Sequence, residues 1–136
     1  MLKGQCHCGA VRYEMTPTTV HHTLCHCQDC RRATGAPAVS WGMVAKADLK
    51  VDGEPKIYAS SEHGRRHFCS NCGTSLFYTN EVVFPGLIDV QTATLDDAGQ
   101  IPLQGQIQLA ESISWMGELG SLPKFDHYPG EEPEAP

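Results

Sequence analysis

The seven cysteines constrain this chain more than any other feature of its sequence. An odd number of cysteines cannot pair off completely as disulfides within one chain. Thiols also stay reduced in the cytosol, where short cysteine spacings are more typical of metal sites. We therefore interpret these residues as metal ligands. They form three groups, C-x-C at Cys6 and Cys8, C-x-C-x-x-C at Cys25, Cys27 and Cys30, and C-x-x-C at Cys69 and Cys72.

The first and third groups together predict one closed site. With Zn–S bonds near 2.3 Å, four sulfurs around a tetrahedral ion lie roughly 3.7 Å apart. A C-x-x-C segment wraps a tight turn around the ion, and Gly73 fits a position that needs positive φ. A C-x-C segment places two thiolates on the same face of an extended chain. Cys6, Cys8, Cys69 and Cys72 are thus expected to hold a structural zinc whose binding energy stabilises the fold.

The second group leaves three thiols for a second ion. Three protein ligands with an open fourth position distinguish catalytic zinc from structural zinc, and a thiol bound there is deprotonated. Other interpretations stay open: a histidine closing the site, a redox pair of Cys27 and Cys30, or a site that loads zinc only transiently. His26 lies between two ligands and is expected to point away from the ion. The histidines near enough in sequence are His21, His22 and His26.

The remaining sequence predicts an all-β antiparallel domain with one short helical turn. Short apolar alternations recur every 8–12 residues between Gly, Pro, Asn and Asp. The helical turn is expected over residues 27–34, ended by Gly35. A chain of 136 residues fits a single domain, here residues 1–128, followed by an acidic tail, residues 129–136, expected to be disordered. The expected strands cover residues 11–15, 20–24, 38–44, 56–60, 65–69, 75–79, 86–91 and 107–115.

Charge and hydropathy exclude several classes of function. The net charge of −6 disfavours a nucleic-acid binder, although residues 1–68 carry +3 (nine Lys and Arg against six Asp and Glu). That cationic first half is compatible with a small anionic ligand. No apolar run reaches the ~18–20 residues of a membrane span. Residues 1–5 lack the apolar stretch of a signal peptide, so we expect a cytoplasmic protein that binds neither membrane nor nucleic acid.

Three segments carry a resemblance to the glutathione-dependent formaldehyde-activating enzyme family. They are residues 4–13 (GQCHCGAVRY), residues 25–35 (CHCQDCRRATG) and residues 68–76 (FCSNCGTSL). Weaker similarities lie at residues 94–97, 114–115 and 122–125. The similarity extends over nearly the whole chain, up to Tyr128.

The resemblance implies a zinc-pinned antiparallel β domain of the β-tent type with two zinc ions per chain. The family's structural zinc falls on Cys6, Cys8, Cys69 and Cys72, in agreement with the spacing argument. Its catalytic zinc falls on Cys25, Cys27 and Cys30. The implied activity is that of a carbon–sulfur lyase, the condensation of glutathione with formaldehyde to S-hydroxymethylglutathione.

Several neighbouring side chains are candidates for supporting roles. Arg31 and Arg32 could place positive charge near the ion and bind a carboxylate, although an exposed helix end is the simpler expectation. Asp29 is expected to cap the helix or lie on the surface rather than accept a hydrogen bond in the site. Trp41 and Trp115 are expected in the core. The basic stretch His63, Arg65, Arg66 and His67 is expected on a solvated strand face.

These observations predict a zinc-dependent enzyme that forms or cleaves an adduct between a thiol, glutathione by preference, and a small aldehyde such as formaldehyde. Three thiolates and Zn²⁺ leave a net charge of −1, which nearby arginine could offset. The alternative is a non-catalytic protein-interaction module in which both zinc ions are structural. The number of zinc ions per chain and the effect of losing Cys27 or Cys69 separate the two hypotheses.

Overall fold

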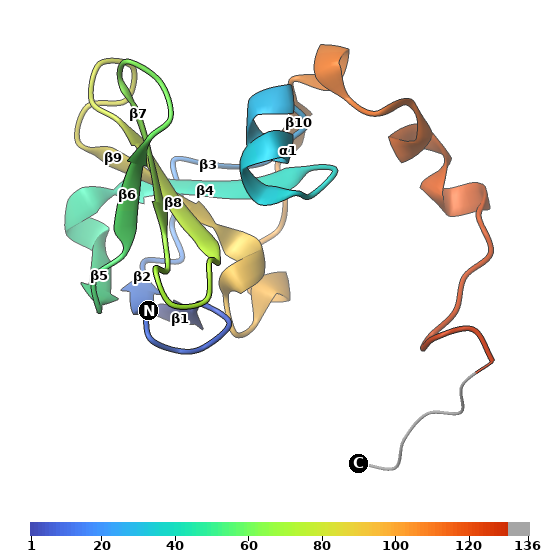
Figure 1. The fold of residues 1–136 in the computed structure, drawn as a ribbon, viewed down its shortest axis with the longest axis horizontal. Helices are drawn as coiled ribbons and strands as arrows, with labels where there is room; N and C mark the ends of the chain where they lie inside the picture. The colour runs from blue at the N-terminus through green and yellow to red at the C-terminus, as the bar shows by residue number, and fades with distance from the viewer. Residues whose placement is uncertain (131–136) are drawn as a thin grey trace.

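The computed structural model describes residues 1–130, which form two β-sheets and a C-terminal segment that leaves them (Figure 1). Residues 131–136, most of the predicted disordered tail, lie outside the described residues. The smaller sheet has the order β1 (Leu2–Gln5), β2 (Arg12–Met15), β5 (Leu49–Asp52). The larger has the order β10 (Gly105–Ile107), β3 (His21–Cys25), β4 (Val39–Ala45), β9 (Leu87–Gln91), β8 (Ser75–Asn80), β7 (Gly64–Phe68), β6 (Lys56–Ala59).

Helical structure is short. The α-helix α1 (Gln28–Thr34) lies between β3 and β4. The 3-10 turns are η1 (Lys46–Asp48), η2 (Thr92–Thr94), η3 (Ala98–Gln100), η4 (Leu109–Glu111) and η5 (Ser114–Ser121). The protein is therefore mostly β, as the sequence predicted, and none of the helices in residues 1–130 is long and apolar enough to cross a membrane.

Three features of the sheets differ from the prediction. β1 and β5 were missed, because both are short strands with only one fully buried residue between them, Gly4, and so show no apolar alternation. The predicted strand over residues 107–115 is wrong: only Gly105–Ile107 pairs, and the chain then forms η4 and η5, where no neighbouring strand is available. That pairing, β10 with β3, is parallel rather than antiparallel.

The main core lies between the two sheets. Tyr13 of β2 packs edge-on against Phe77 of β8 with ring centroids 5.3 Å apart, and Met15, Val44 and Val90 are fully buried around them. Gly4 is required here, because a Cβ at this position would lie 2.3 Å from the Tyr13 ring. Cys6 and Cys69 belong to the same buried cluster, so the first and third cysteine groups lie at the edge of this core.

α1 begins and ends where the sequence predicted. The Cys27 sulfur caps its start by accepting a hydrogen bond from the Cys30 backbone N–H at 3.2 Å. Gly35 ends it in the left-handed conformation, with φ of 74°. Since the cap is itself one of the cysteines, helix formation and the arrangement of the second cysteine group are coupled.

Strand register aligns one row of side chains on the face of the larger sheet that carries Cys25. Direct cross-strand partners join His21 to Met43, Met43 to Asp89, Asp89 to Tyr78 and Tyr78 to Arg66. Because directly paired residues share a face, three ionisable side chains from β3, β9 and β7 lie in one row. This row forms the floor of the region described next.

Candidate functional site

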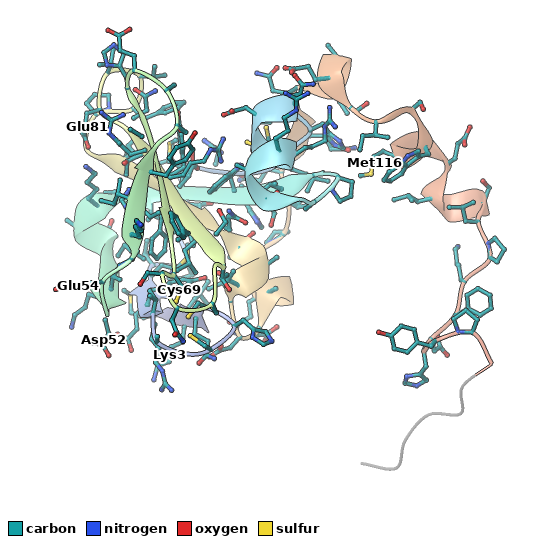
Figure 2. The ribbon with its side chains drawn as sticks, in the orientation of Figure 1. Lys3, Asp52, Glu54, Cys69, Glu81 and Met116 are labelled. Atoms are coloured by element: carbon teal, nitrogen blue, oxygen red, sulfur yellow. The ribbon has the colours of Figure 1, made fainter. Side chains whose placement is uncertain are left out.

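The cysteines of the first and third groups converge as predicted. The sulfurs of Cys6, Cys8, Cys69 and Cys72 all lie within 4.8 Å of one another. Cys8 Sγ is 3.7 Å from Cys6 Sγ and 3.8 Å from Cys69 Sγ, which matches the roughly 3.7 Å edge of a tetrahedral four-thiolate zinc site. Gly73 adopts φ of +83°, as the turn after Cys72 requires. We call this group the closed cluster; Cys69 is labelled in Figure 2.

Hydrogen bonds to Cys8 and Cys72 favour their thiolate forms, whereas burial and contact with Cys6 and Cys72 raise the pKa of Cys69. Asn71 Nδ2 donates to Cys8 Sγ at 3.2 Å and lowers the pKa of the Cys8 thiol. The Thr74 hydroxyl lies 3.2 Å from Cys72 Sγ and lowers the pKa of Cys72 to about 5. The Val11 N–H donates to Cys6 Sγ at 3.3 Å. Donors to a ligating sulfur stabilise its charged form, so this donor set fits a bound cation.

The second cysteine group also converges. The sulfurs of Cys25, Cys27 and Cys30 lie within 4.8 Å of one another, at the end of β3 and the start of α1. In residues 1–130 no histidine, carboxylate or further cysteine completes this group at that distance. The group therefore offers three sulfurs that could hold a metal ion, and we call it the open cluster.

The thiols of the open cluster cannot all ionise easily without a cation. Contact with Cys30 and burial raise the pKa of Cys25, and burial raises the pKa of Cys27. Contact with Cys25 instead lowers the pKa of Cys30 to about 5, with the Arg66 guanidinium adding to the effect. Only one of these three neighbouring thiols ionises readily by itself. A bound divalent ion would stabilise the thiolate form of all three, so the group is suited to hold such an ion.

A cavity of about 250 Å³ opens beside the open cluster. Its volume is at the small end for ligand sites, which suits a reacting end of a substrate rather than a whole large molecule. The cavity is lined by apolar side chains and by titratable side chains. The titratable side chains come from β3, α1, β7, β8 and β9 and from the loop before α1. The lining residues are His21, Cys25, Cys27, Asp29, Cys30, Trp41, Arg66, Tyr78, Phe84, Asp89, Ile107 and Gln108.

Arg66 is the cation of this cavity. Its side chain is only 6% exposed, and Nη2 donates to Asp29 Oδ2 at 2.6 Å and lies 3.7 Å from Cys30 Sγ. The guanidinium also stacks 5.2 Å from the centre of the Tyr78 ring. Its Nε and Nη1 are buried without a hydrogen-bond partner among the described residues. A buried cation beside a thiolate cluster offsets negative charge that water cannot screen.

Asp89 is a buried carboxyl in the middle of the same row. It is 7% exposed, and its Oδ1 has no hydrogen-bond partner among residues 1–130. Burial, and to a lesser degree the charge of Cys30, raises the pKa of Asp89 to about 7. A carboxyl with a pKa near neutrality can both accept and return a proton, and such perturbed groups concentrate at functional sites.

The histidines considered as fourth ligands, His21, His22 and His26, are not part of the sulfur group. His26 points away, as expected, and its Nε2 is 2.9 Å from Gln106 Oε1. His22 is buried between the Pro102 carbonyl and the Thr92 hydroxyl. His21 lines the cavity, where burial lowers the pKa of its imidazole, but it is not part of the sulfur group.

Three expectations for neighbouring residues, Arg66, Asp29 and Trp115, need correction, and a fourth, for Trp41, is confirmed and extended. Arg66 is buried in the site rather than on a solvated face, because alternate residues of β7 face opposite sides of the sheet. Asp29, 74% exposed, accepts the Arg66 hydrogen bond rather than serving only as a cap or surface residue. Trp41 is buried, as expected, and also lines the cavity. Trp115 is 47% exposed instead of lying in the core.

Arg31 and Arg32 do not line the cavity. Arg31 Nη2 donates to the Glu111 carbonyl at 3.3 Å, and Arg32 is exposed. The simpler expectation, an exposed basic helix end, is therefore confirmed for Arg32. The cation that lies near the sulfurs is Arg66.

Sequence reasoning overlooked Asp89 entirely. The available signal was its position within LIDVQ, a strand that is otherwise apolar apart from its last residue. A lone carboxyl in a buried strand needs a partner or a function, because an unpaired buried charge is costly. Its alignment with Arg66 could not be read from the sequence, since it depends on the register of β7, β8 and β9.

Comparison with known proteins gives the same family as the cysteine pattern. A family model described as glutathione-dependent formaldehyde-activating enzyme matches residues 1–111. This range contains all seven cysteines, Arg66 and Asp89.

Individual relatives agree with that match. A Halomonas elongata protein, named provisionally as a glutathione-dependent formaldehyde-activating enzyme, is 29% identical over 96% of this chain and 90% of its own length. A Schizosaccharomyces pombe protein named as an uncharacterised lyase is 32% identical over 57% of this chain, and the match spans 58% of its length. A crystal structure of a Rhodobacter sphaeroides protein superimposes with a TM-score of 0.56 and 25% identity, over 77% of this chain and 99% of that one. The chain belongs to the glutathione-dependent formaldehyde-activating enzyme family.

Proposed function

We propose that this protein is a zinc-dependent carbon–sulfur lyase, similar to S-hydroxymethylglutathione synthase, that joins a thiol to a small aldehyde or reverses that step. Glutathione and formaldehyde are the proposed substrates, in keeping with the family description. The observation that carries the proposal is the open cluster: three converging sulfurs facing a cavity that also contains a buried cation and a buried carboxyl.

Cys25, Cys27 and Cys30 would hold the catalytic zinc ion. When bound, zinc would supply an acidic position at which a substrate thiol loses its proton near neutral pH. Arg66 contributes a positive charge 3.7 Å from Cys30 Sγ, which offsets the excess negative charge of three thiolates. Asp29 fixes the direction of the Arg66 side chain through the 2.6 Å ion pair.

Asp89 is suited to carry the proton. Addition of RSH to H₂C=O forms one S–C bond, opens the C=O double bond and moves one proton from sulfur to oxygen. Ionised Asp89 can accept the thiol proton and, once protonated, return it to the new alkoxide, which gives RS–CH₂OH. The reverse order cleaves the adduct. A pKa of about 7 allows both transfers at neutral pH.

The cavity also limits the substrate. About 250 Å³ accommodates the sulfur end of a thiol together with a small aldehyde, so the rest of a tripeptide thiol would extend past the rim. Trp41, Tyr78 and Phe84 provide apolar walls that reduce access of water to the reacting atoms.

The closed cluster is proposed to hold the second, structural zinc. Cys6 follows β1 of the smaller sheet and Cys69 follows β7 of the larger, so this ion would pin the two sheets together as in a β-tent fold. We further propose a single domain over residues 1–128 and a cytoplasmic location, with no nucleic-acid or membrane partner.

The test combines metal content with an assay of adduct formation. Zinc per chain is measured by plasma mass spectrometry for the wild type, Cys27→Ser and Cys69→Ser. Exchange between ¹³C-formaldehyde and its glutathione adduct is followed by exchange NMR, with the enzyme-free rate as background. We expect two zinc ions in the wild type, one in a folded Cys27→Ser variant, and exchange at the background rate in that variant.

Other outcomes would contradict the proposal. A wild type with two tightly bound zinc ions and only background exchange for glutathione and other small thiols would favour the non-catalytic interaction module. A Cys27→Ser variant that exchanges as fast as the wild type would remove the open cluster from the reaction.

A further inference from the structure

The C-terminal arm, residues 108–130, is the part of the molecule least explained by the proposed function. The chain leaves β10 at Gln108, the one non-glycine residue in residues 1–130 with positive φ, at 58°. Glu111 then makes two contacts with α1: its Oε1 accepts from the Gln28 N–H at 3.2 Å, and its carbonyl accepts from Arg31 Nη2 at 3.3 Å. Later hydrogen bonds in the described residues stay within the arm.

Beyond Glu111 the arm runs clear of both sheets (Figure 1), and Met116 in η5 lies well away from them (Figure 2). Ile113 and Met116 of the arm are half-buried, but six of its large apolar side chains are exposed, from 47% for Trp115 to 76% for Tyr128. They are Leu109, Trp115, Leu119, Leu122, Phe125 and Tyr128. Exposed apolar side chains gathered in one short segment favour an interaction site, because their contact with water is unfavourable.

The arm also cannot stabilise itself. η5 has eight residues, and isolated helices of this length do not offset the entropy lost when the backbone is ordered. Gly117, Gly120 and Pro123 further disfavour a longer helix. The arm therefore needs an external surface that covers its apolar side chains.

The body of the same chain offers a matching surface at its other sheet edge. β6 is the terminal strand of the larger sheet, opposite β10, and all four of its residues are exposed. A hollow of about 580 Å³ lies between β6, α1 and the turn after Cys72. Its walls are mostly apolar with a cationic rim. The lining residues are Arg32, Ala33, Lys56, Ile57, Tyr58, Arg66, Phe68, Gly73 and Ser75. We call this surface the β6 hollow.

Charge complements shape in this pairing. The described arm carries Glu111, Glu118 and Asp126 against a single Lys124. The charged residues of the β6 hollow are the exposed cations Arg32 and Lys56 and the buried Arg66, which is already paired with Asp29. An acidic, aromatic segment and a basic, apolar hollow attract each other and discriminate against other pairings.

We propose that the occupant is a second copy of this chain: the C-terminal arm of each protomer docks in the β6 hollow of the other and forms a two-fold symmetric dimer. Because arm and hollow belong to the same chain, one two-fold operation satisfies both arms and closes the assembly. The direction of the arm, away from its own body, favours exchange over folding back. Since Arg66 lines both the hollow and the cavity of the open cluster, the partner's arm would lie next to that site.

This inference does not depend on the proposed function, and its test measures mass. Sedimentation velocity of the full zinc-loaded chain from 1 to 100 µM should give 29.6 kDa, twice the 14.8 kDa of one chain. Two variants should shift the boundary to 14.8 kDa: Trp115→Ala with Phe125→Ala in the arm, and Ile57→Glu with Tyr58→Glu in the hollow. Val82→Ser, an equally exposed apolar residue outside both surfaces, should leave the dimer unchanged.

Mixing the two monomeric variants sharpens the test. Each retains one intact surface, so one arm–hollow pair can still form, and we expect a heterodimer that dissociates at least tenfold more readily than the wild type. Circular dichroism and zinc content verify that both variants are folded. A wild-type monomer at 100 µM overturns the proposal. A dimer that survives either double variant, or an equimolar mixture that stays monomeric, overturns the assigned arm–hollow contact.

Discussion

The two cysteine clusters share a chemistry but differ in what they connect. The closed cluster takes its sulfurs from segments about 60 residues apart, one following β1 and one following β7, at the edge of the main core. The open cluster takes all three from residues 25–30, between β3 and α1. Metal binding to a cluster that joins distant segments would stabilise the fold. A cluster formed by one short segment could exchange its fourth, non-protein ligand while the rest of the fold stays intact.

The surroundings of the clusters differ in the same sense. The closed cluster is surrounded by short-range donors, Asn71, Thr74 and the Val11 N–H, which suit permanent thiolates. The open cluster faces a cavity with Arg66 and Asp89, which have unpartnered polar atoms among the described residues. Unsatisfied buried polar groups need an explanation, and a ligand bound beside the open cluster would supply one for Arg66 and Asp89.

The largest expected difference between the clusters concerns the fold itself. Cys69→Ser removes a ligand that connects the two sheets, and structural zinc contributes about 10–16 kcal/mol, comparable to the whole stability of a domain. We expect this variant to be unfolded at 25 °C, whereas Cys27→Ser, the matched control, keeps a dispersed ¹H–¹⁵N NMR spectrum. Two equally well-folded variants would contradict the division into structural and open clusters.

Metal removal should separate the clusters kinetically. With three protein ligands, the open cluster would leave one side of its zinc ion accessible to a chelator, whereas four thiolates enclose the ion of the closed cluster. Zinc release should therefore occur in two phases whose rates differ by a factor on the order of ten or more. A chromogenic chelator follows the release, and circular dichroism should change only in the slow phase. The fast phase should be missing from Cys27→Ser, and a single phase in the wild type would contradict the comparison.

Asp89 should make stability depend on pH near the open cluster. Its pKa is raised from 3.8 to about 7 in the fold, so the wild type loses stability as the pH rises from about 4 to 7, as Asp89 must ionise in a buried position. Asp89→Asn removes this loss. The difference in unfolding free energy between the two proteins should grow with pH and level off above about 7.

That difference should reach on the order of 4 kcal/mol at pH 8, because each pKa unit corresponds to about 1.4 kcal/mol. Urea unfolding of both proteins at each pH measures it, and Asp97→Asn, at an exposed turn, serves as the control. A difference that is constant from pH 5 to 8 would show that Asp89 ionises at its ordinary pKa.

The smallest expected effect concerns thiol binding. Arg66→Met removes the cation beside Cys30 while keeping an apolar side chain over Tyr78, and we expect glutathione affinity to fall about tenfold, or about 1.4 kcal/mol. Arg66→Lys should recover part of it. Isothermal titration calorimetry measures the affinity, and the double variant Arg31→Ala with Arg32→Ala should bind as the wild type does. The reverse ranking would return the supporting role to the helix arginines.

Much of the candidate site follows from local sequence. The spacings of the cysteines, Gly73 after Cys72 and Gly35 after α1 fix short-range geometry, because two or three intervening residues leave few backbone paths that bring sulfurs together. Alternation located β2, β3, β4, β6, β7, β8 and β9 to within a few residues. These features are set by the nearest neighbours in the chain, and the sequence determines them by itself.

Only the tertiary structure decided which side chains surround the open cluster and where the C-terminal arm lies. Arg66 and Asp89 meet the sulfurs because β7, β8 and β9 pair in one particular register, and a shift of one residue would turn both to the other face. The exposure of Trp115 likewise depends on whether a surface elsewhere covers it, and a preference for burial in the sequence does not specify which surface that is. Registers and docking faces are properties of pairs of distant segments, so one-dimensional spacing leaves them undetermined.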